Sequence, residues 1–216
     1  HHIFSASSSA GYLMDGCTFD TSERGFWMQG TSGDHVIRNC TFVDNDYSIW
    51  FQQTTGSEDV INCTFDGSEF GIIPHVGTGT QTISDSSFSN CDLGLYSVGA
   101  TAVDVSNCEA YGNQIGMLLY ATTSVTAEYS RFHNNSVHGM ELQGFYDSTF
   151  TVDGDIRYNV FENNTWSGLF CNYTNNIAEI YENVFNDNRY GIDANFDANN
   201  TIHDNNFYSN DAGIYL

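Results

Sequence analysis

The sequence predicts an all-β solenoid in which about nine coils of 22–24 residues stack parallel strands on one another. A phrase of three residues, usually ending in phenylalanine, occurs nine times, from Cys17-Thr18-Phe19 to Asn205-Asn206-Phe207. Successive phrases are 22 to 24 residues apart, with one step of 29. A unit this short cannot bury its own apolar face, so neighbouring units must stack to form a core.

Each unit is predicted to contain two or three short strands separated by tight corners. An apolar residue, the repeated phrase, a small turn-forming residue and a glycine–apolar pair follow one another in this order. The apolar positions are Met14, Ile37, Val60, Ile83, Val105, Ala127, Ile156, Ile180 and Ile202, and the turn positions are Ser22, Asn45, Ser68, Cys91, Asn113, Asn135, Asn164, Asn188 and Asn210. An antiparallel sandwich or propeller also has evenly spaced strands. Its hairpin turns, however, do not require the same core residue at the same phase nine times.

The unit at residues 202–214 resembles the coil repeat of the right-handed parallel β-helix in the pectin-lyase-like superfamily. The resemblance covers residues 11–216 and implies one β-helix domain, preceded by a lead-in at residues 1–10. The 29-residue step predicts an insertion near residues 144–155. This resemblance is specific for the fold and not for a function, because enzymes, adhesins and envelope proteins share it.

The charge of the chain excludes several partners. Five arginines and no lysine stand against 27 acidic residues, which gives a formal net charge of −22. Nucleic-acid binding requires clustered basic side chains, and the arginines here are dispersed. Anionic membrane surfaces would repel the chain. The sequence contains no run of 18 apolar residues, so no transmembrane segment is predicted.

The first position of the repeated phrase is predicted to form a ladder along the solenoid. Asn159, Asn183 and Asn205 share this position, so each side-chain amide is expected to bond to the next coil. In the N-terminal coils this position is occupied by Cys17, Cys40, Cys63 and Cys108. A strand spacing of about 4.8 Å allows a disulfide between neighbouring coils, but side chains in an in-register ladder point the same way, which favours buried free thiols. Cys91 and Cys171 lie outside this ladder and are candidates for pairing with another chain.

Two kinds of surface modification or ligand are expected. The sequons begin at Asn39, Asn62, Asn134, Asn163, Asn172 and Asn199, and they weakly support a glycosylated protein that is extracellular or on the cell surface. Acid pairs offer oxygen ligands for Ca²⁺ at Asp44/Asp46, Asp153/Asp155 and Asp193/Asp197. A solvated acidic surface is the preferred interpretation of these pairs, and no cofactor is otherwise predicted.

The catalytic sets of the enzymes with this fold are not found in the sequence. The hydrolases that resemble polygalacturonase carry an Asp-Asp pair, a Gly-His-Gly and an Arg-x-Lys, whereas this chain has no Asp-Asp dipeptide, no lysine and Val137-His138-Gly139 in place of the histidine motif. Lyases that resemble pectate lyase need a cationic base beside Ca²⁺-binding acids. Paired carboxylates for general glycoside hydrolysis remain open, because outward acids on adjacent coils readily reach the required separation.

Two functions follow from these observations. Open terminal coils favour head-to-tail stacking of subunits, so the first hypothesis is a structural solenoid that self-associates into a cell-surface layer, sheath or filament. The alternative is a secreted carbohydrate-binding or polysaccharide-cleaving β-helix, with glycans as partners and Trp27, Trp50 and Trp166 as sugar-stacking residues. Trp27 and Trp50 share a phase and are expected to stack on each other, while Trp166 lies at a corner.

Overall fold

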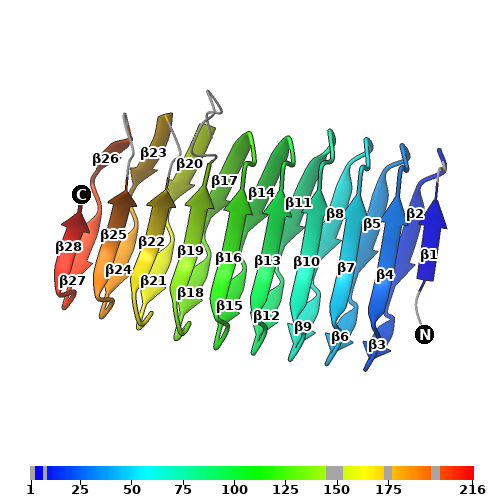
Figure 1. Cartoon of the computed structure of the whole chain (residues 1–216), viewed down its shortest axis with the longest axis horizontal. Helices are drawn as coiled ribbons and strands as arrows, with labels where there is room; N and C mark the ends of the chain where they lie inside the picture. Colours follow the sequence, from blue (N-terminus) through cyan, green and yellow to red (C-terminus); the bar gives the residue numbers. More distant parts are fainter. Residues whose placement is uncertain (1–2, 7–8, 145–152, 173–176, 196–199) are drawn as a thin grey trace.

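The chain forms three parallel β-sheets wound around one axis. The computed structural model describes residues 3–6, 9–144, 153–172, 177–195 and 200–216. Within these ranges the backbone forms strands β1 to β28 and no helix. Each coil adds one strand to each sheet, and the coils stack from β2 at one end to β27 at the other (Figure 1). The prediction of an all-β solenoid of about nine coils is confirmed.

The three sheets differ in strand length, and every pair of neighbouring strands is parallel. Sheet A consists of β1 (Ile3–Ala6), β4 (Arg24–Gln29), β7 (Tyr47–Gln52), β10 (Phe70–His75), β13 (Leu93–Val98), β16 (Ile115–Tyr120), β19 (His138–Gln143), β22 (Ser167–Asn172), β25 (Tyr190–Asn195) and β28 (Ala212–Tyr215). Sheet B consists of β2 (Tyr12–Asp15), β5 (His35–Arg38), β8 (Glu58–Ile61), β11 (Thr80–Ser84), β14 (Ala102–Ser106), β17 (Ser124–Glu128), β20 (Asp153–Arg157), β23 (Ile177–Tyr181) and β26 (Thr201–His203). Sheet C consists of β3 (Thr18–Asp20), β6 (Thr41–Val43), β9 (Thr64–Asp66), β12 (Ser87–Ser89), β15 (Glu109–Tyr111), β18 (Arg131–His133), β21 (Val160–Glu162), β24 (Val184–Asn186) and β27 (Asn206–Tyr208).

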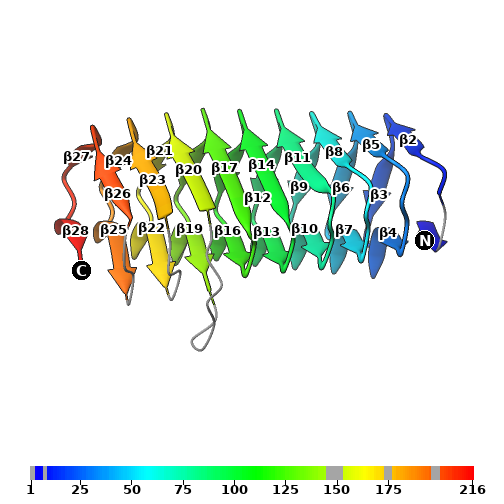
Figure 2. The ribbon, with the colours of Figure 1, turned by 90° about the horizontal axis from the view of Figure 1, so that it is seen from above.

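The sheets begin earlier than the repeat predicts. β1 pairs in parallel with β4, so part of the expected lead-in at residues 1–10 belongs to sheet A. The repeated phrase does not extend to this segment, which is why the sequence pattern missed it. Most of the insertion predicted near residues 144–155 lies outside the described residues. On its far side β20 pairs in register with β17, so sheet B continues across it (Figure 2).

A row of phenylalanines runs through the core and fixes the register. The Phe of each repeated phrase faces inward from sheet C, and from Phe42 to Phe185 these side chains are fully buried. Neighbouring rings stack with centroids 4.9–5.1 Å apart, which is the spacing of the coils. Ala110 replaces one ring and pairs with Phe88 and Phe132 in the same register. Identical residues therefore meet because the coils stack without a shift.

Two ladders of polar side chains line the corners on either side of sheet C. In the first, the Asn159 amide donates to Asn183 Oδ1 at 3.1 Å, and the Asn183 amide donates to Asn205 Oδ1 at 3.0 Å. The second ladder was not expected from the sequence, where its residues were interpreted only as turn formers. It links Asn113, Asn135, Asn164, Asn188 and Asn210 through amide bonds of 2.9–3.2 Å. Each amide also satisfies backbone groups, so these buried side chains replace the strand pairing that a corner lacks.

The cysteines other than Cys17, which is partly exposed, lie in the interior. Cys17, Cys40, Cys63, Cys91 and Cys108 are free thiols, and burial raises the pKa of Cys63 to about 11 and that of Cys108 to about 12. Cys91 is buried at the second corner ladder, and Cys171 is buried in the core beneath sheet A. The expectation that these two residues pair with another chain is wrong for this fold, because neither sulfur reaches the surface.

The N-terminal coils enclose a polar cluster inside the solenoid. Glu58 faces inward from sheet B and has no solvent exposure. The Gln81 amide donates to Glu58 Oε2 at 2.8 Å, and burial raises the pKa of Glu58 despite this bond. His35 occupies the same inward row one coil earlier, where burial lowers its pKa. Both groups are therefore held toward their neutral forms.

The Glu58→Gln variant should be more stable than the parent protein at neutral and higher pH. Because the folded-state pKa of Glu58 lies above its unfolded value, its stabilising contribution is present at acidic pH and is lost as pH rises through the folded pKa. Urea unfolding at pH 5 and pH 8 should show the gain of Glu58→Gln over the parent growing with pH. The exposed acid Glu69, changed to Gln, serves as the control. An equal effect of the two substitutions at both pH values would contradict the assignment.

Candidate functional site

The outer face of sheet A carries three rows of side chains along the helix axis. The core residues of each strand, such as Ile49 and Phe51 of β7, point inward, and the residues between them point out. The first row is Arg24, Tyr47, Phe70, Leu93, Ile115, His138, Ser167, Tyr190 and Ala212. The second row is Trp27, Trp50, Ile73, Tyr96, Leu118, Glu141, Phe170, Asp193 and Tyr215. The third row is Gln29, Gln52, His75, Val98, Tyr120, Gln143, Asn172 and Asn195.

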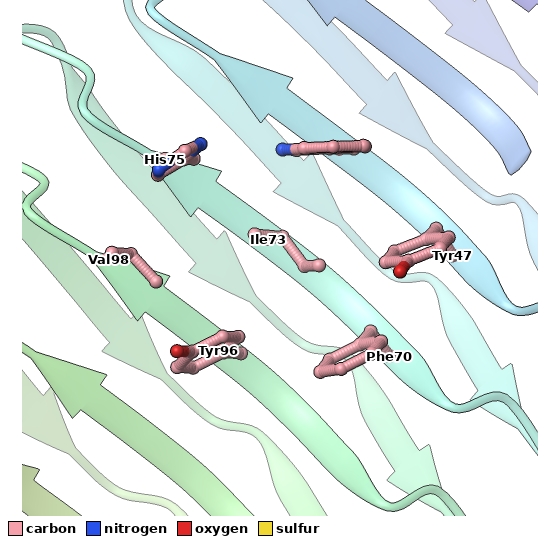
Figure 3. Close-up of a pocket in the computed structure, with 7 residues that line it drawn as sticks. Tyr47, Phe70, Ile73, His75, Tyr96 and Val98 are labelled. Carbon is pink, nitrogen blue, oxygen red and sulfur yellow. The ribbon is translucent and has the colours of Figure 1, made fainter.

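A shallow aromatic groove lies across β7, β10 and β13 on this face. It has a volume of about 290 Å³ and is lined by Tyr47, Trp50, Phe70, Ile73, His75, Tyr96 and Val98 (Figure 3). The rings form a continuous platform, since Tyr47 stacks on Trp50 at 5.4 Å and on Phe70 at 5.2 Å between centroids. Phe70 stacks in turn on Tyr96 at 5.9 Å.

The platform continues toward the N-terminal coil. Trp27 and Trp50 stack with centroids 5.6 Å apart, and the Arg24 guanidinium carbon lies 4.3 Å from the Trp27 ring centroid. This cation–π contact holds the indole in place. Trp166 is separate from the platform: it lies at a corner beside β22, is 45 % exposed, and has Arg189 4.4 Å from its ring centroid. Of the three tryptophans considered in the sequence, the structure thus brings two together.

A row of acids borders the aromatic groove. Glu23, Asp46, Glu69 and Asp92 each directly precede a strand of sheet A and are exposed. Their backbones are in register, because the Tyr47 N–H donates to the Glu23 carbonyl and the Phe70 N–H donates to the Asp46 carbonyl. In the next coils the position is uncharged, at Gln114 and Val137. The acids therefore accompany the coils that carry the aromatic groove.

A second feature of the same face lies over β19, β22 and β25. His138, Glu141 and Asp193 belong to the outward rows but are more than nine-tenths buried. Burial raises the pKa of Glu141 to about 7 and lowers that of His138 to about 4. The His138 ring stacks on Phe170 with centroids 4.7 Å apart. We call these four residues the polar centre. It was not expected from the sequence, because the equivalent positions in other coils carry other residue types.

The sequons lie mainly away from sheet A. Asn39, Asn62, Asn134 and Asn163 are exposed corner residues with positive φ. The Asn62 amide donates to Asn39 Oδ1 at 2.8 Å, so these two side chains pair along the surface. Asn172 ends β22, and Asn199 lies outside the described residues. Glycosylation of these asparagines stays a prediction.

The acid pairs proposed as calcium ligands are not gathered into one site by the described residues. No group of three or more His, Cys, Asp or Glu side chains suited to a metal ion is found in the described ranges. Asp155 forms an ion pair with Arg157, and Asp193 faces outward in sheet A, whereas Asp197 lies outside the described residues. Calcium binding stays a prediction.

The fold and its repeat define the class of protein. The family model named right handed beta helix region matches residues 3–80 and 54–207, so the chain belongs to the right-handed β-helix family. No curated protein matches the sequence significantly. No helix of the described structure is long and apolar enough to span a membrane.

Solved structures show the same fold. The crystal structure of the periplasmic alginate epimerase AlgG aligns with a TM-score of 0.71 at 12 % identity, over 99 % of this chain and 65 % of that one. Its T265N T268M double mutant aligns with a TM-score of 0.66 at 13 % identity, over 94 % of this chain and 59 % of that one. The chain thus spans less than two thirds of these proteins, and the likeness concerns the fold.

Proposed function

We propose that this protein binds a polysaccharide along the outer face of sheet A. The aromatic groove is the observation that supports this proposal. Nearly parallel rings, stacked on one another across the strands, form a row of aromatic side chains that lines the groove together with Ile73 and Val98, and such a row offers apolar contacts to successive units of a sugar chain. The polar edges of Tyr47, Tyr96 and His75 supply hydrogen bonds for sugar hydroxyls.

The partner that the charges favour is a neutral or amino-sugar polysaccharide. In the outward rows of sheet A listed above, Arg24 is the one arginine. Its guanidinium lies against the rings of Trp27 and Trp50. The acids Glu23, Asp46, Glu69 and Asp92 flank the groove and would repel the carboxylates of a polyuronate. The substrate named for the structural neighbours is thus not carried over to this chain.

This proposal replaces assembly as the main hypothesis. The aromatic groove is already formed by packed side chains, and it supports polysaccharide binding more directly than any feature described above supports self-association into a sheath. An acidic protein that binds polysaccharide is expected to work outside the cytoplasm, in agreement with the extracellular location predicted from the sequence. Self-association stays a prediction.

Removal of the groove's rings should weaken binding without unfolding the protein. Trp50→Ala and Tyr96→Ala each remove a ring that lines the groove, so retention in affinity electrophoresis through gels containing a neutral polysaccharide should fall about 10-fold, since a contacting ring contributes roughly 1–2 kcal/mol. The control is Tyr208→Ala, which removes a 54 % exposed ring on sheet C. Unchanged retention of the groove variants, or equal loss in the control, would show that the glycan binds elsewhere.

Polymer charge and salt provide a second test. At low ionic strength the protein should bind glucan, mannan or chitosan oligosaccharides in preference to alginate or polygalacturonate. Changing Asp46 and Glu69 together to Asn and Gln should weaken chitosan binding and leave neutral glucan binding unchanged, because only the charged ligand senses the acids. Isothermal titration at 20 and 200 mM NaCl measures both effects. Tighter binding of alginate than of glucan would contradict the proposed class of partner.

A further inference from the structure

The polar centre contains groups whose burial the fold itself does not require. His138 is 9 %, Glu141 8 % and Asp193 7 % exposed, although all three lie in outward rows of sheet A. Among the described residues His138 Nδ1 is buried without a hydrogen-bond partner, and burial is the one cause of the raised pKa of Glu141. Leaving buried polar groups without partners costs free energy. Such groups in a structural protein are ordinarily replaced by apolar residues, as at the equivalent Leu118 and Ile115.

The register places the two carboxyl groups at a defined separation. Glu141 pairs with Phe170, and Phe170 pairs with Asp193, so the acids occupy one row with a single coil between them. Two strand spacings give a Cα separation of roughly 9.6 Å. The intervening Phe170 ring is stacked on His138, which lies in the neighbouring row. Phe170 itself occupies the row position between the two acids, which therefore lie on either side of it along the helix axis.

The two carboxyl groups have different surroundings. Glu141 pairs in register with Leu118 and Phe170, and burial alone raises its pKa to about 7. Asp193 accepts a hydrogen bond from the Asn195 amide at 3.2 Å. Burial raises its pKa, but Ser167 and the positive charge of Arg189 oppose this effect. Burial thus acts unopposed on Glu141 and is opposed by neighbouring groups at Asp193, and such a difference in surroundings assigns acid and base roles to a pair of carboxyl groups.

We propose that Glu141 and Asp193 are the general acid and the general base of a glycoside-hydrolysing centre on the same face of sheet A. This inference rests on the proposed function, since the aromatic groove would hold the polysaccharide that this centre cleaves. The chemical class of substrate is the neutral or amino-sugar polysaccharide of the proposed function, because acids border the groove and the neighbouring Arg189 packs over the rings of Trp166 and Tyr190.

Hydrolysis would proceed by a single displacement. Glu141 donates its proton to the glycosidic oxygen as the bond between that oxygen and the anomeric carbon breaks. Asp193 removes a proton from a water molecule, whose oxygen forms the new bond to the anomeric carbon from the opposite face. The leaving sugar carries away the proton of Glu141, and the proton held by Asp193 returns to Glu141 through solvent. A single displacement of this kind inverts the configuration at the anomeric carbon.

Phe170 and His138 act as positioning residues in this centre. The half-exposed Phe170 ring offers a stacking surface between the acids, and its contact with His138 fixes its orientation. The low pKa of His138 keeps the ring neutral, so that it does not lower the pKa of Glu141 by adding a positive charge.

The test combines binding and hydrolysis on the full chain. Glucan, xylan, mannan and chitosan are assayed first for binding and then for newly formed reducing ends, with the anomer of the product followed by NMR. The wild-type protein should release reducing ends from a polymer that it binds. Glu141→Gln and Asp193→Asn should lower the rate about 10²- to 10⁴-fold while binding is retained. Glu179→Gln, an exposed acid on sheet B, is the matched control and should leave the rate unchanged.

A second measurement distinguishes a catalytic role from a structural one. An aryl glycoside with a nitrophenolate leaving group needs no protonation, so Glu141→Gln should recover most of its activity on this substrate and lose the basic limb of the pH profile near 7. Binding of a polymer without hydrolysis would overturn this inference and leave the proposed function intact. Absence of binding to every polymer would overturn the proposed function itself. A retained anomeric configuration, or full activity of both acid variants, would also overturn the assignment.

Discussion

The structure depends on one constraint, the in-register stacking of parallel coils at the strand spacing. Backbone hydrogen bonds between neighbouring coils fix this spacing at just under 5 Å, and every side chain then lies directly above its counterpart. Inside the solenoid the constraint produces the phenylalanine row and the asparagine ladders. Outside, the same constraint turns aromatic residues on successive strands into a platform. The core and the candidate site are therefore two consequences of one geometry.

Stacking also explains how a chain with a net charge of −22 can present an apolar binding face. A charged residue repeated in register repels its copies, so acids are tolerated at exposed corners, where water screens them. Sheet A is kept nearly free of such charges, and its aromatic groove is bordered by acids and not lined by them. The two carboxyl groups that do face outward from sheet A, Glu141 and Asp193, are set apart by a coil and held in different surroundings. Charge placement thus separates the acidic surface from the site.

The fold could be predicted from the sequence because it depends on residues that recur. The Phe of the repeated phrase and the apolar residue before it mark sheets B and C in every coil. β1 was missed, since Ile3–Ala6 carries no phrase and joins the sheet only through its pairing with β4. The second asparagine ladder was visible as a turn position, but its hydrogen bonds become apparent only when the corners are superposed in space.

The candidate site was harder to predict because its residues vary from coil to coil. The shared phase of Trp27 and Trp50 indicated one end of the row, but Ile73 and Tyr96, which continue it, share no residue type with them, so no repeat indicates these two residues. His138 and Glu141 stand in the same two rows as Tyr47 and Trp50, and only the pairing of the strands shows this equivalence. Their unusual pKa values arise from burial, which a sequence does not report. The outward rows of a β-helix therefore carry the functional information, and the inward rows carry the fold.

The most direct test of this account is a crystal structure of the protein with a bound neutral oligosaccharide of four to six sugar units. We expect the sugar chain to run along the helix axis on the outer face of sheet A, with successive rings over Trp50, Phe70 and Tyr96 and its direction leading toward Glu141. An oligosaccharide seated on sheet B, on sheet C or at a corner would contradict the central claim that the outward rows of sheet A form the binding site.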